Sequence, residues 1–294
     1  YPKSIFITAA MAEGTGLVEF ARRFPMRYFD VGIAEGHAVT FAAGLAACGF
    51  RPVVAIYSTF LQRAYDNIIH DVALQNLPVV FVLDRGGIVG EDGPTHHGAF
   101  DLSYLCTVPN MIVAAPRNGT ELRNLMFTAL EQNDAPFAIR YPKDSYVEFD
   151  DQAPAVPYQI GKWEIIQNGQ DVAILSVGVM TNNAIEAACL LKPKNIFPTI
   201  VHARFVKPLD TQMLSEIASK HRIIITIEEN SIVGGFGEQV ARFFAEQNLP
   251  QKINILAIPD RFIEQGAREI LLRNLALDAV GIANKIEQIY HKLE

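Results

Sequence analysis

The chain has 294 residues, a formal net charge of −7 at pH 7, and hydrophobic side chains at 50% of its positions. This length is enough for two domains of ordinary size, and the composition is typical of a well-buried globular protein. No block of like charges is present, which argues against a nucleic-acid partner, and no apolar run reaches the roughly 18 residues of a membrane span. We therefore expect neither nucleic acid nor membrane among its partners.

The three cysteines, Cys48, Cys106 and Cys189, lie far apart among apolar residues. Their spacing fits neither a disulfide framework nor a zinc site, so we expect small buried thiols in a reducing compartment, the cytoplasm. The sequence opens on Tyr-Pro-Lys-Ser, without a methionine or a signal segment. We interpret it as a piece of a larger protein.

Short apolar runs alternate with helical patterns through the first half of the chain. Strands are expected at residues 5–8, 27–31, 52–57, 79–84, 111–114 and 137–141, and helices near 14–23, 35–48, 61–74 and 119–131. This order predicts a parallel sheet covered by helices. An acidic stretch with prolines follows, and we place a linker at residues 146–160.

The alternation resumes after this linker. Strands are expected at residues 171–177, 198–203, 223–228 and 252–257, and helices near 182–191, 211–219, 235–247 and 276–292. The sequence therefore predicts an α/β protein of two consecutive domains, residues 1–145 and 161–294. Each is expected to be a mainly parallel sheet flanked by helices.

Polar and aromatic side chains follow several strands of the first predicted sheet, where sites of open α/β sheets lie. They fall in four segments: Glu35, residues 57–63, the glycine-rich loop 84–98, and residues 140–143. Together the segments offer a carboxylate, an aromatic ring, a histidine with an acid, and several cations. Such a set suits an anionic substrate held beside an aromatic cofactor.

Each of these residues also has an ordinary structural interpretation. Glu35 would be either an acid at a helix start or a buried carboxylate whose pKa an apolar site raises. Phe60 alone would be a core residue, Arg63 a solvated helix residue, and His96 with His97 a surface pair. The histidines lack a third ligand for zinc, and no Gly-Lys-Ser/Thr makes the loop a phosphate loop. Four segments at one sheet edge favour the functional interpretation.

Residues 30–46 resemble the pyrimidine-binding domain of the transketolase superfamily, whose members use thiamine diphosphate. Residues 57–66, 84–105 and 260–266 are similar to the 1-deoxy-D-xylulose-5-phosphate synthase family within it. Residues 201–210 and 228–238 resemble the superfamily's C-terminal domain, which is expected mainly to support a dimer and the pyrimidine-binding domain. The resemblance covers nearly the whole chain.

The resemblance implies a transferase that decarboxylates pyruvate and joins its remaining two carbons to glyceraldehyde 3-phosphate. The product, 1-deoxy-D-xylulose 5-phosphate, is a precursor of isoprenoids, thiamine and pyridoxal. For the cofactor it implies that Glu35 contacts the aminopyrimidine ring and activates it, that Phe60 stacks on that ring, and that Ile33 lies near the thiazolium.

For the substrates the resemblance implies that Tyr57, Arg63 and Lys143 hold the phosphate. Asp92 and His96 would line the pocket as catalytic residues, where they handle protons or bind carboxylate and hydroxyl groups. Two departures from the family pattern bear on this. Gly36 follows the key glutamate in place of the usual glutamine, and Lys143-Asp144 replaces an Arg-Gly pair. Lysine keeps the charge but loses the two-pronged grip of arginine, so weaker phosphate binding is expected.

The superfamily holds the cofactor's diphosphate through Mg²⁺ bound to a Gly-Asp-Gly motif, and this sequence contains no such motif. We therefore expect no metal site in this chain, and the Mg²⁺ ligands in a missing N-terminal diphosphate-binding domain or separate chain. The chain alone should be nearly inactive, and the complete enzyme a homodimer. Two alternatives remain open: a beta-type subunit of a split transketolase or 2-oxoacid dehydrogenase, and a non-catalytic assembly protein with the same fold.

Overall fold

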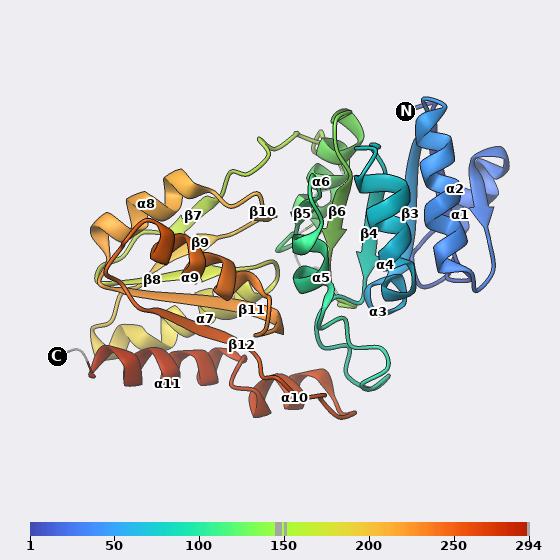
Figure 1. Ribbon diagram of the computed structural model, residues 1–294. Coiled ribbons are helices and arrows are strands. Elements are labelled where there is room, and N and C mark those ends of the chain that lie inside the picture. The colour runs from blue at the N-terminus through green and yellow to red at the C-terminus, as the bar shows by residue number, and fades with distance from the viewer. Residues whose placement is uncertain (145–148, 150–151, 293–294) are drawn as a thin grey trace.

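The computed structural model describes residues 1–144, 149 and 152–292, and these form two sheets (Figure 1). Within that range the first sheet has seven strands in the order β10-β5-β6-β4-β3-β1-β2, all parallel except β10, which is antiparallel to β5. The strands are β1 (Ser4–Thr8), β2 (Tyr28–Asp30), β3 (Arg51–Tyr57), β4 (Val80–Asp84), β5 (Ile112–Ala114), β6 (Phe137–Arg140) and β10 (Phe205–Lys207).

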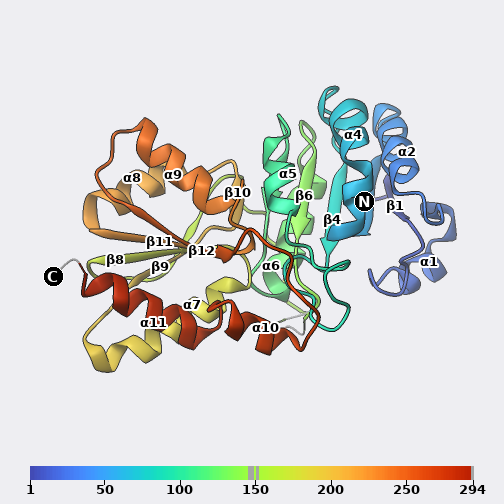
Figure 2. The same cartoon turned by 60° about the horizontal axis from the view of Figure 1, so that its bottom comes forward.

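Helices cover both faces of this sheet, as right-handed crossovers require (Figure 2). One face carries α2 (Glu35–Ala47), α4 (Tyr65–Asn67) and α5 (Asp101–Thr107), and the other carries α1 (Val18–Arg23) and α6 (Gly119–Glu131). With both faces covered, the central strands are apolar throughout, and every residue of β4 is buried.

The expected helix at residues 61–74 is not one regular helix. It is divided into α3 (Ser58–Leu61), a 3-10 turn at Gln62–Ala64, α4, and a π-helical segment at Ile68–Ala73. The direction of each side chain there therefore departs from the 3.6-residue period on which the prediction depended.

The second sheet, counted over the described residues, has the strand order β12-β11-β8-β9-β7, with β7 antiparallel to β9 and the others parallel. Its strands are β7 (Glu164–Gln167), β8 (Val172–Ser176), β9 (Thr199–His202), β11 (Ile223–Ser231) and β12 (Ile253–Ile258). In Figure 1, α8 (Thr211–Lys220) and α9 (Phe236–Glu246) lie on one face, and α7 (Met180–Leu191) and α11 (Ala279–Tyr290) on the other.

The predicted fold class, an α/β protein with two mainly parallel sheets flanked by helices, is confirmed. The strands β7 and β10 and the short helices α5 and α10 (Arg268–Asn274) were not predicted.

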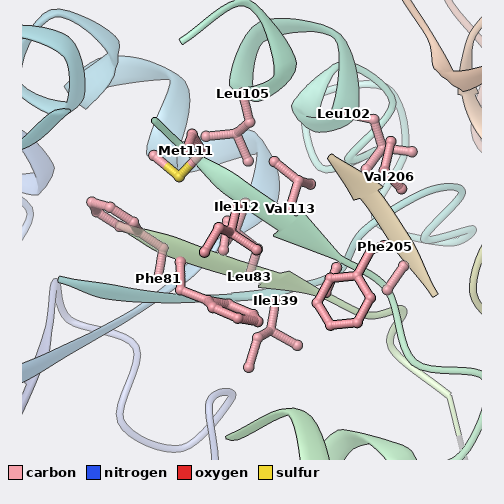
Figure 3. Close-up of a cluster of buried hydrophobic side chains, with 14 of the residues drawn as sticks. Phe81, Leu83, Leu102, Leu105, Met111, Ile112, Val113, Ile139, Phe205 and Val206 are labelled. Carbon is pink, nitrogen blue, oxygen red and sulfur yellow. The ribbon is translucent and has the colours of Figure 1, made fainter. Parts of the chain in front are cut away.

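One hydrophobic core spans both halves around the first sheet, because β10 comes from the second half of the chain and completes the edge of that sheet. Phe205 and Val206 are fully buried, and Figure 3 shows them among side chains of the first sheet and α5. The ring of Phe205 lies 6.2 Å from that of Phe137 in an edge-to-face contact. Separation of the halves would therefore expose apolar surface on both.

A buried ion network also joins the halves. Glu121 of α6 accepts hydrogen bonds from His202 Nε2 at 2.8 Å and from Arg204 Nη2 at 2.6 Å. Burial raises the pKa of Glu121, but His202 and Arg204 outweigh it and hold that pKa well below its usual range. The carboxylate is therefore ionised and paired on both of its oxygens.

Some expectations need correction. Cys48 and Cys189 are exposed, and only Cys106 is partly buried, so the expectation of buried thiols was wrong for two of them; all three are unpaired. Residues 146–148 and 150–151 of the expected linker lie outside the described residues. In the described part of the chain, no helix has both the length and the apolar character needed to cross a membrane.

Candidate active site

The carboxyl ends of β3, β4 and β6 meet at one edge of the first sheet, because these strands are parallel neighbours. The segments that follow them are α3, the loop of residues 85–98, and residues 141–144. The sequence-predicted site residues of these three segments thus come together at this edge. Glu35 and Ile33 follow β2 instead, and Ile33 lies before α2 with 81% of its surface exposed.

Glu35 is both a helix-start residue and a buried carboxylate. It is the first residue of α2, and its side chain is only 3% exposed. Arg63 Nη1 donates to Glu35 Oε1 at 2.9 Å, while the side chain of Arg63, on the 3-10 turn, is 60% exposed. Among the described residues only Arg63 donates to this carboxylate, and Oε2 receives no hydrogen bond. One oxygen of a buried acid is therefore available to a ligand.

Phe60 lies in the middle of an aromatic and cationic group. Its ring stacks with that of Tyr57 at 5.7 Å between centroids, and the His96 ring approaches edge-on at 5.2 Å. The guanidinium of Arg63 lies 5.3 Å from the same ring. Glu35, Tyr57, Phe60, Arg63 and His96 are thus one connected cluster built from three separate segments.

Tyr57 links this cluster to a charged group at the ends of β4 and β6. Arg85 lies over the Tyr57 ring at 3.6 Å, and its Nη1 is 3.2 Å from Asp84 Oδ2. Burial raises the pKa of the Tyr57 hydroxyl, and the charge of Arg85 opposes that rise. Lys143 Nζ lies 3.4 Å from Asp92 Oδ2, and both side chains are substantially exposed. The expected phosphate-binding and pocket-lining residues are therefore close neighbours.

The adjacent histidines have different environments. His96 is partly exposed, and its Nδ1 is 2.9 Å from Thr95 Oγ1. His97 is 4% exposed, accepts from the Val89 amide at Nδ1, and lies 3.3 Å from Glu264 O through Nε2. Burial lowers the pKa of His97, which keeps it neutral. The structure thus separates a structural histidine from one that is available to a substrate.

The described residues contain no group of three or more His, Cys, Asp or Glu side chains that could hold a metal ion.

Both halves of the chain match known protein families. Residues 1–148 match the family "Transketolase, pyrimidine binding domain", and residues 161–282 match "Transketolase, C-terminal domain". The chain belongs to the transketolase family.

The relatives narrow the resemblance within the transketolase family. The chain is 53% identical over 290 residues to 1-deoxy-D-xylulose-5-phosphate synthase of Aquifex aeolicus, which covers 97% of this chain and 45% of that protein. It is 54% identical over 288 residues to 1-deoxy-D-xylulose-5-phosphate synthase 1 of Geobacter sulfurreducens, with the same two coverages. These relatives confirm the expected resemblance, and the chain spans about 45% of their length.

Solved structures of the transketolase family agree with the fold. A chain described as "Split gene transketolase, inactive beta4 tetramer" superposes with a TM-score of 0.85 at 28% identity, covering 98% of this chain and 91% of that one. Transketolase from Campylobacter jejuni gives a TM-score of 0.79 at 18% identity, covering 98% of this chain and 44% of that one, and supports the fold alone.

Two features of this transketolase-family site go beyond the sequence analysis. A Cβ at Gly36, the departure noted above, would lie 2.9 Å from Asn67 Oδ1, so the glycine accommodates the neighbouring side chain. Arg85 was overlooked as a site residue, although it directly follows the strand that ends at Asp84. Its φ of +61° is rare for a residue with a side chain, and such backbone strain is often found at functional sites.

Proposed function

We propose that this chain supplies the pyrimidine-binding and C-terminal domains of a thiamine-diphosphate-dependent 1-deoxy-D-xylulose-5-phosphate synthase of the cytoplasm. Residues 1–145 and 161–294 would be the two domains, and residues 146–160 their linker. The complete enzyme would condense pyruvate with D-glyceraldehyde 3-phosphate and release CO2. The observation that carries this proposal is Glu35, a buried carboxylate with one oxygen available and the other paired with Arg63, whose guanidinium lies 5.3 Å from the Phe60 ring.

The residues present fit the aminopyrimidine end of the cofactor. The open Oε2 of Glu35 suits a protonated ring nitrogen, and Phe60 supplies a partly exposed aromatic ring nearby. Arg63 pairs with Oε1 of Glu35 and so leaves Oε2 available to that ring nitrogen. When bound, thiamine diphosphate supplies the nucleophilic carbon and the electron sink for decarboxylation. The Mg²⁺ ligands are assigned to the other half of the enzyme, and Ile33 to the vicinity of the thiazolium.

The cations around Tyr57 support binding of a phosphorylated acceptor. Tyr57, Arg63 and Lys143 are the residues expected from the sequence, and the geometry adds Arg85, whose guanidinium lies over the Tyr57 ring. Arginine binds two phosphate oxygens at once, so Arg85 compensates for the fork that Lys143 lacks.

Asp92 and His96 are proposed to handle protons and to bind the polar groups of the substrates. His96 Nδ1 is held by Thr95, and Nε2 has no hydrogen-bond partner in the described residues. An imidazole fixed at one nitrogen presents the other in a defined direction, as a proton donor or acceptor requires.

We further propose a homodimer in which the diphosphate half completes the site. Substitution of Glu35 by glutamine in the complete enzyme tests the central assignment. It should abolish exchange of the thiazolium C2 proton of bound cofactor, followed by NMR, while circular dichroism remains that of the wild type. Unchanged exchange would refute the role of Glu35. The isolated chain, given both substrates, Mg²⁺ and cofactor, should form little product, and normal turnover would refute the need for a second half.

The likeness to a split gene transketolase chain favours a second candidate, a beta-type subunit that acts with a separate chain. The donor substrate separates the two. Release of CO2 from pyruvate indicates the synthase, whereas transfer from a ketose phosphate without CO2 release indicates a transketolase.

A further inference from the structure

The loop of residues 85–98, here called the substrate loop, is anchored by the C-terminal half of the chain. It begins at Arg85 and carries Asp92 and His96, yet Glu229 of β11 accepts a hydrogen bond from the amide of Ile88 at 2.7 Å. Most of the loop is buried, although it contains neither helix nor strand. Its shape depends on one internal pairing, between Gly87 and Gly98, and on contacts with other segments.

Other contacts join the loop and its flanks to the same half. Gly266 N donates to Gly90 O at 3.4 Å, and His97 Nε2 lies 3.3 Å from Glu264 O. Just after the loop, the Ser231 amide donates to Ala99 O at 2.6 Å. Among these contacts, only the one from Glu229 brings a charged group to the loop backbone.

Glu229 is held in place by a residue of the C-terminal half. Its side chain is 0% exposed, and Arg268 Nη2 donates to its Oε2 at 2.9 Å. Both residues belong to the same half, so the buried charge of Glu229 is paired within that half, independently of the loop. The remaining oxygen, Oε1, is the one that meets Ile88 N–H, as a charge-assisted hydrogen bond.

The fit between Glu229 and the loop is close. Gly87, which precedes Ile88, has a φ of +81°, and a Cβ there would lie 2.4 Å from Glu229 Cδ. Only glycine satisfies both the backbone conformation and this approach. The loop sequence is thus shaped to receive this carboxylate.

The backbone of Glu229 extends the connection to the strand that carries Tyr57. Arg140 Nη2 donates to Glu229 O, and Arg140 Nε lies 3.1 Å from Asp101 Oδ2. The same Oδ2 accepts from Ser58 Oγ at 2.8 Å, and Ser58 directly follows Tyr57. Arg140 and Asp101 are both buried, so this path is fixed by fully enclosed partners.

We propose that Glu229 is a positioning residue. It holds the substrate loop in the form that binds the phosphorylated acceptor, although it lies on β11 of the second sheet. This inference rests on the proposed function for its kinetic consequence, whereas the anchoring of the loop is independent of it.

The test uses the complete enzyme with the E229Q substitution, which preserves the size of the side chain but removes its charge. The KM for glyceraldehyde 3-phosphate should rise about tenfold, with kcat changed less than about threefold, because binding geometry and not the chemical step is affected. Thiazolium proton exchange, which depends on Glu35, should stay within about twofold of the wild type. Amide exchange of a peptide covering residues 85–98, measured by mass spectrometry, should rise about tenfold, while that of β3 is unchanged.

A second variant and a control keep the test decisive. E229D retains the charge for Arg268 but draws the carboxylate back from Ile88. If E229Q folds poorly, E229D takes its place, and its loop amides should show the same rise in exchange. E287Q removes an ion pair with Lys194 in the same half and should change neither loop exchange nor KM. Wild-type loop exchange in both Glu229 variants would overturn the anchoring. Faster loop exchange with an unchanged KM would overturn the positioning role. So would a general destabilisation, in which amide exchange rises equally across the whole chain and activity falls with it. A wild-type enzyme without synthase activity would refute the proposed function and leave the exchange result standing.

Discussion

Substitution of Glu121 by glutamine should weaken the union of the two halves by an amount that the structure sets. The carboxylate accepts from His202 Nε2, from Arg204 Nη2 and Nε, and from the Arg117 amide at 2.9 Å. An amide offers one oxygen and turns an NH2 group toward these donors, so at least one buried cation loses its acceptor. Breaking a buried ion pair costs about 3–5 kcal/mol. Because Arg204 retains Glu164 as an acceptor, we expect about 3 kcal/mol, the lower end of that range.

Trp163 provides the assay. It is the only tryptophan of the chain, it is buried, and its indole N–H donates to Phe205 O in β10 at 2.7 Å. Its fluorescence therefore reports on the region where the halves meet. With a urea m-value of about 3 kcal/mol per molar, the unfolding midpoint of E121Q at pH 7 should fall by about 1 M.

The control and the pH dependence test the reasoning. E216Q removes an exposed partner of Lys220 on α8 and should shift stability by less than about 0.5 kcal/mol. Because the folded-state pKa of Glu121 is lowered, its contribution is present above the usual carboxyl pKa and is lost as the pH falls below it. The difference between E121Q and the wild type should therefore shrink at pH 4. Equal midpoints for E121Q and E216Q at pH 7, or a difference that grows in acid, would refute the assigned role.

Three further predictions concern single side chains. G87A should destabilise the fold and raise the KM for the acceptor. The control G49A has a similar φ of +82° and open space around it, so it should show only the backbone strain, about 1 kcal/mol. Equal effects of the two variants on stability would contradict the contact with Glu229. Burial raises the pKa of Glu228 to about 7, so the folded chain retains a proton that the unfolded chain releases, and stability should decline by at most about 3 kcal/mol as the pH rises from about 4.5 to 7. In E228Q that slope should flatten, as urea midpoints at pH 5 and pH 7 will show. R63A in the complete enzyme should raise the KM for glyceraldehyde 3-phosphate by a factor at least about ten times larger than the factor for pyruvate. If thiazolium proton exchange changes instead, Arg63 acts through Glu35.

Much of the fold was predictable, because both sheets are mainly parallel and their buried strands are continuous apolar runs. The position of the candidate site was predictable for the same reason, since parallel strands bring their carboxyl ends to one edge. Glu35 in particular was expected at a helix start after a strand, and it is the first residue of α2.

The remaining features depend on contacts between distant segments. β10 has three residues and pairs with β5, about ninety residues earlier, so no local periodicity indicates it. The pairing of Arg63 with Glu35 depends on a 3-10 turn inside an irregular helical segment, which a regular helical period does not predict. Arg85 carried a signal that was overlooked: it is a cation directly after a strand end and at the start of a glycine-rich loop.

The origin of β10 has a consequence for the order in which this polypeptide becomes foldable. A ribosome builds residues 1–160 before it builds Phe205–Lys207, so the emerging first sheet exposes the unpaired edge of β5 and the apolar surface beneath it for a period. At about 5–20 residues per second, the missing strand follows within several seconds, and the exit tunnel delays it further. During that interval the nascent sheet offers a template for pairing with another chain. A chaperone that covers this edge, or faster elongation that shortens the interval, would therefore matter more for the yield of this protein than for one whose first domain closes on its own residues.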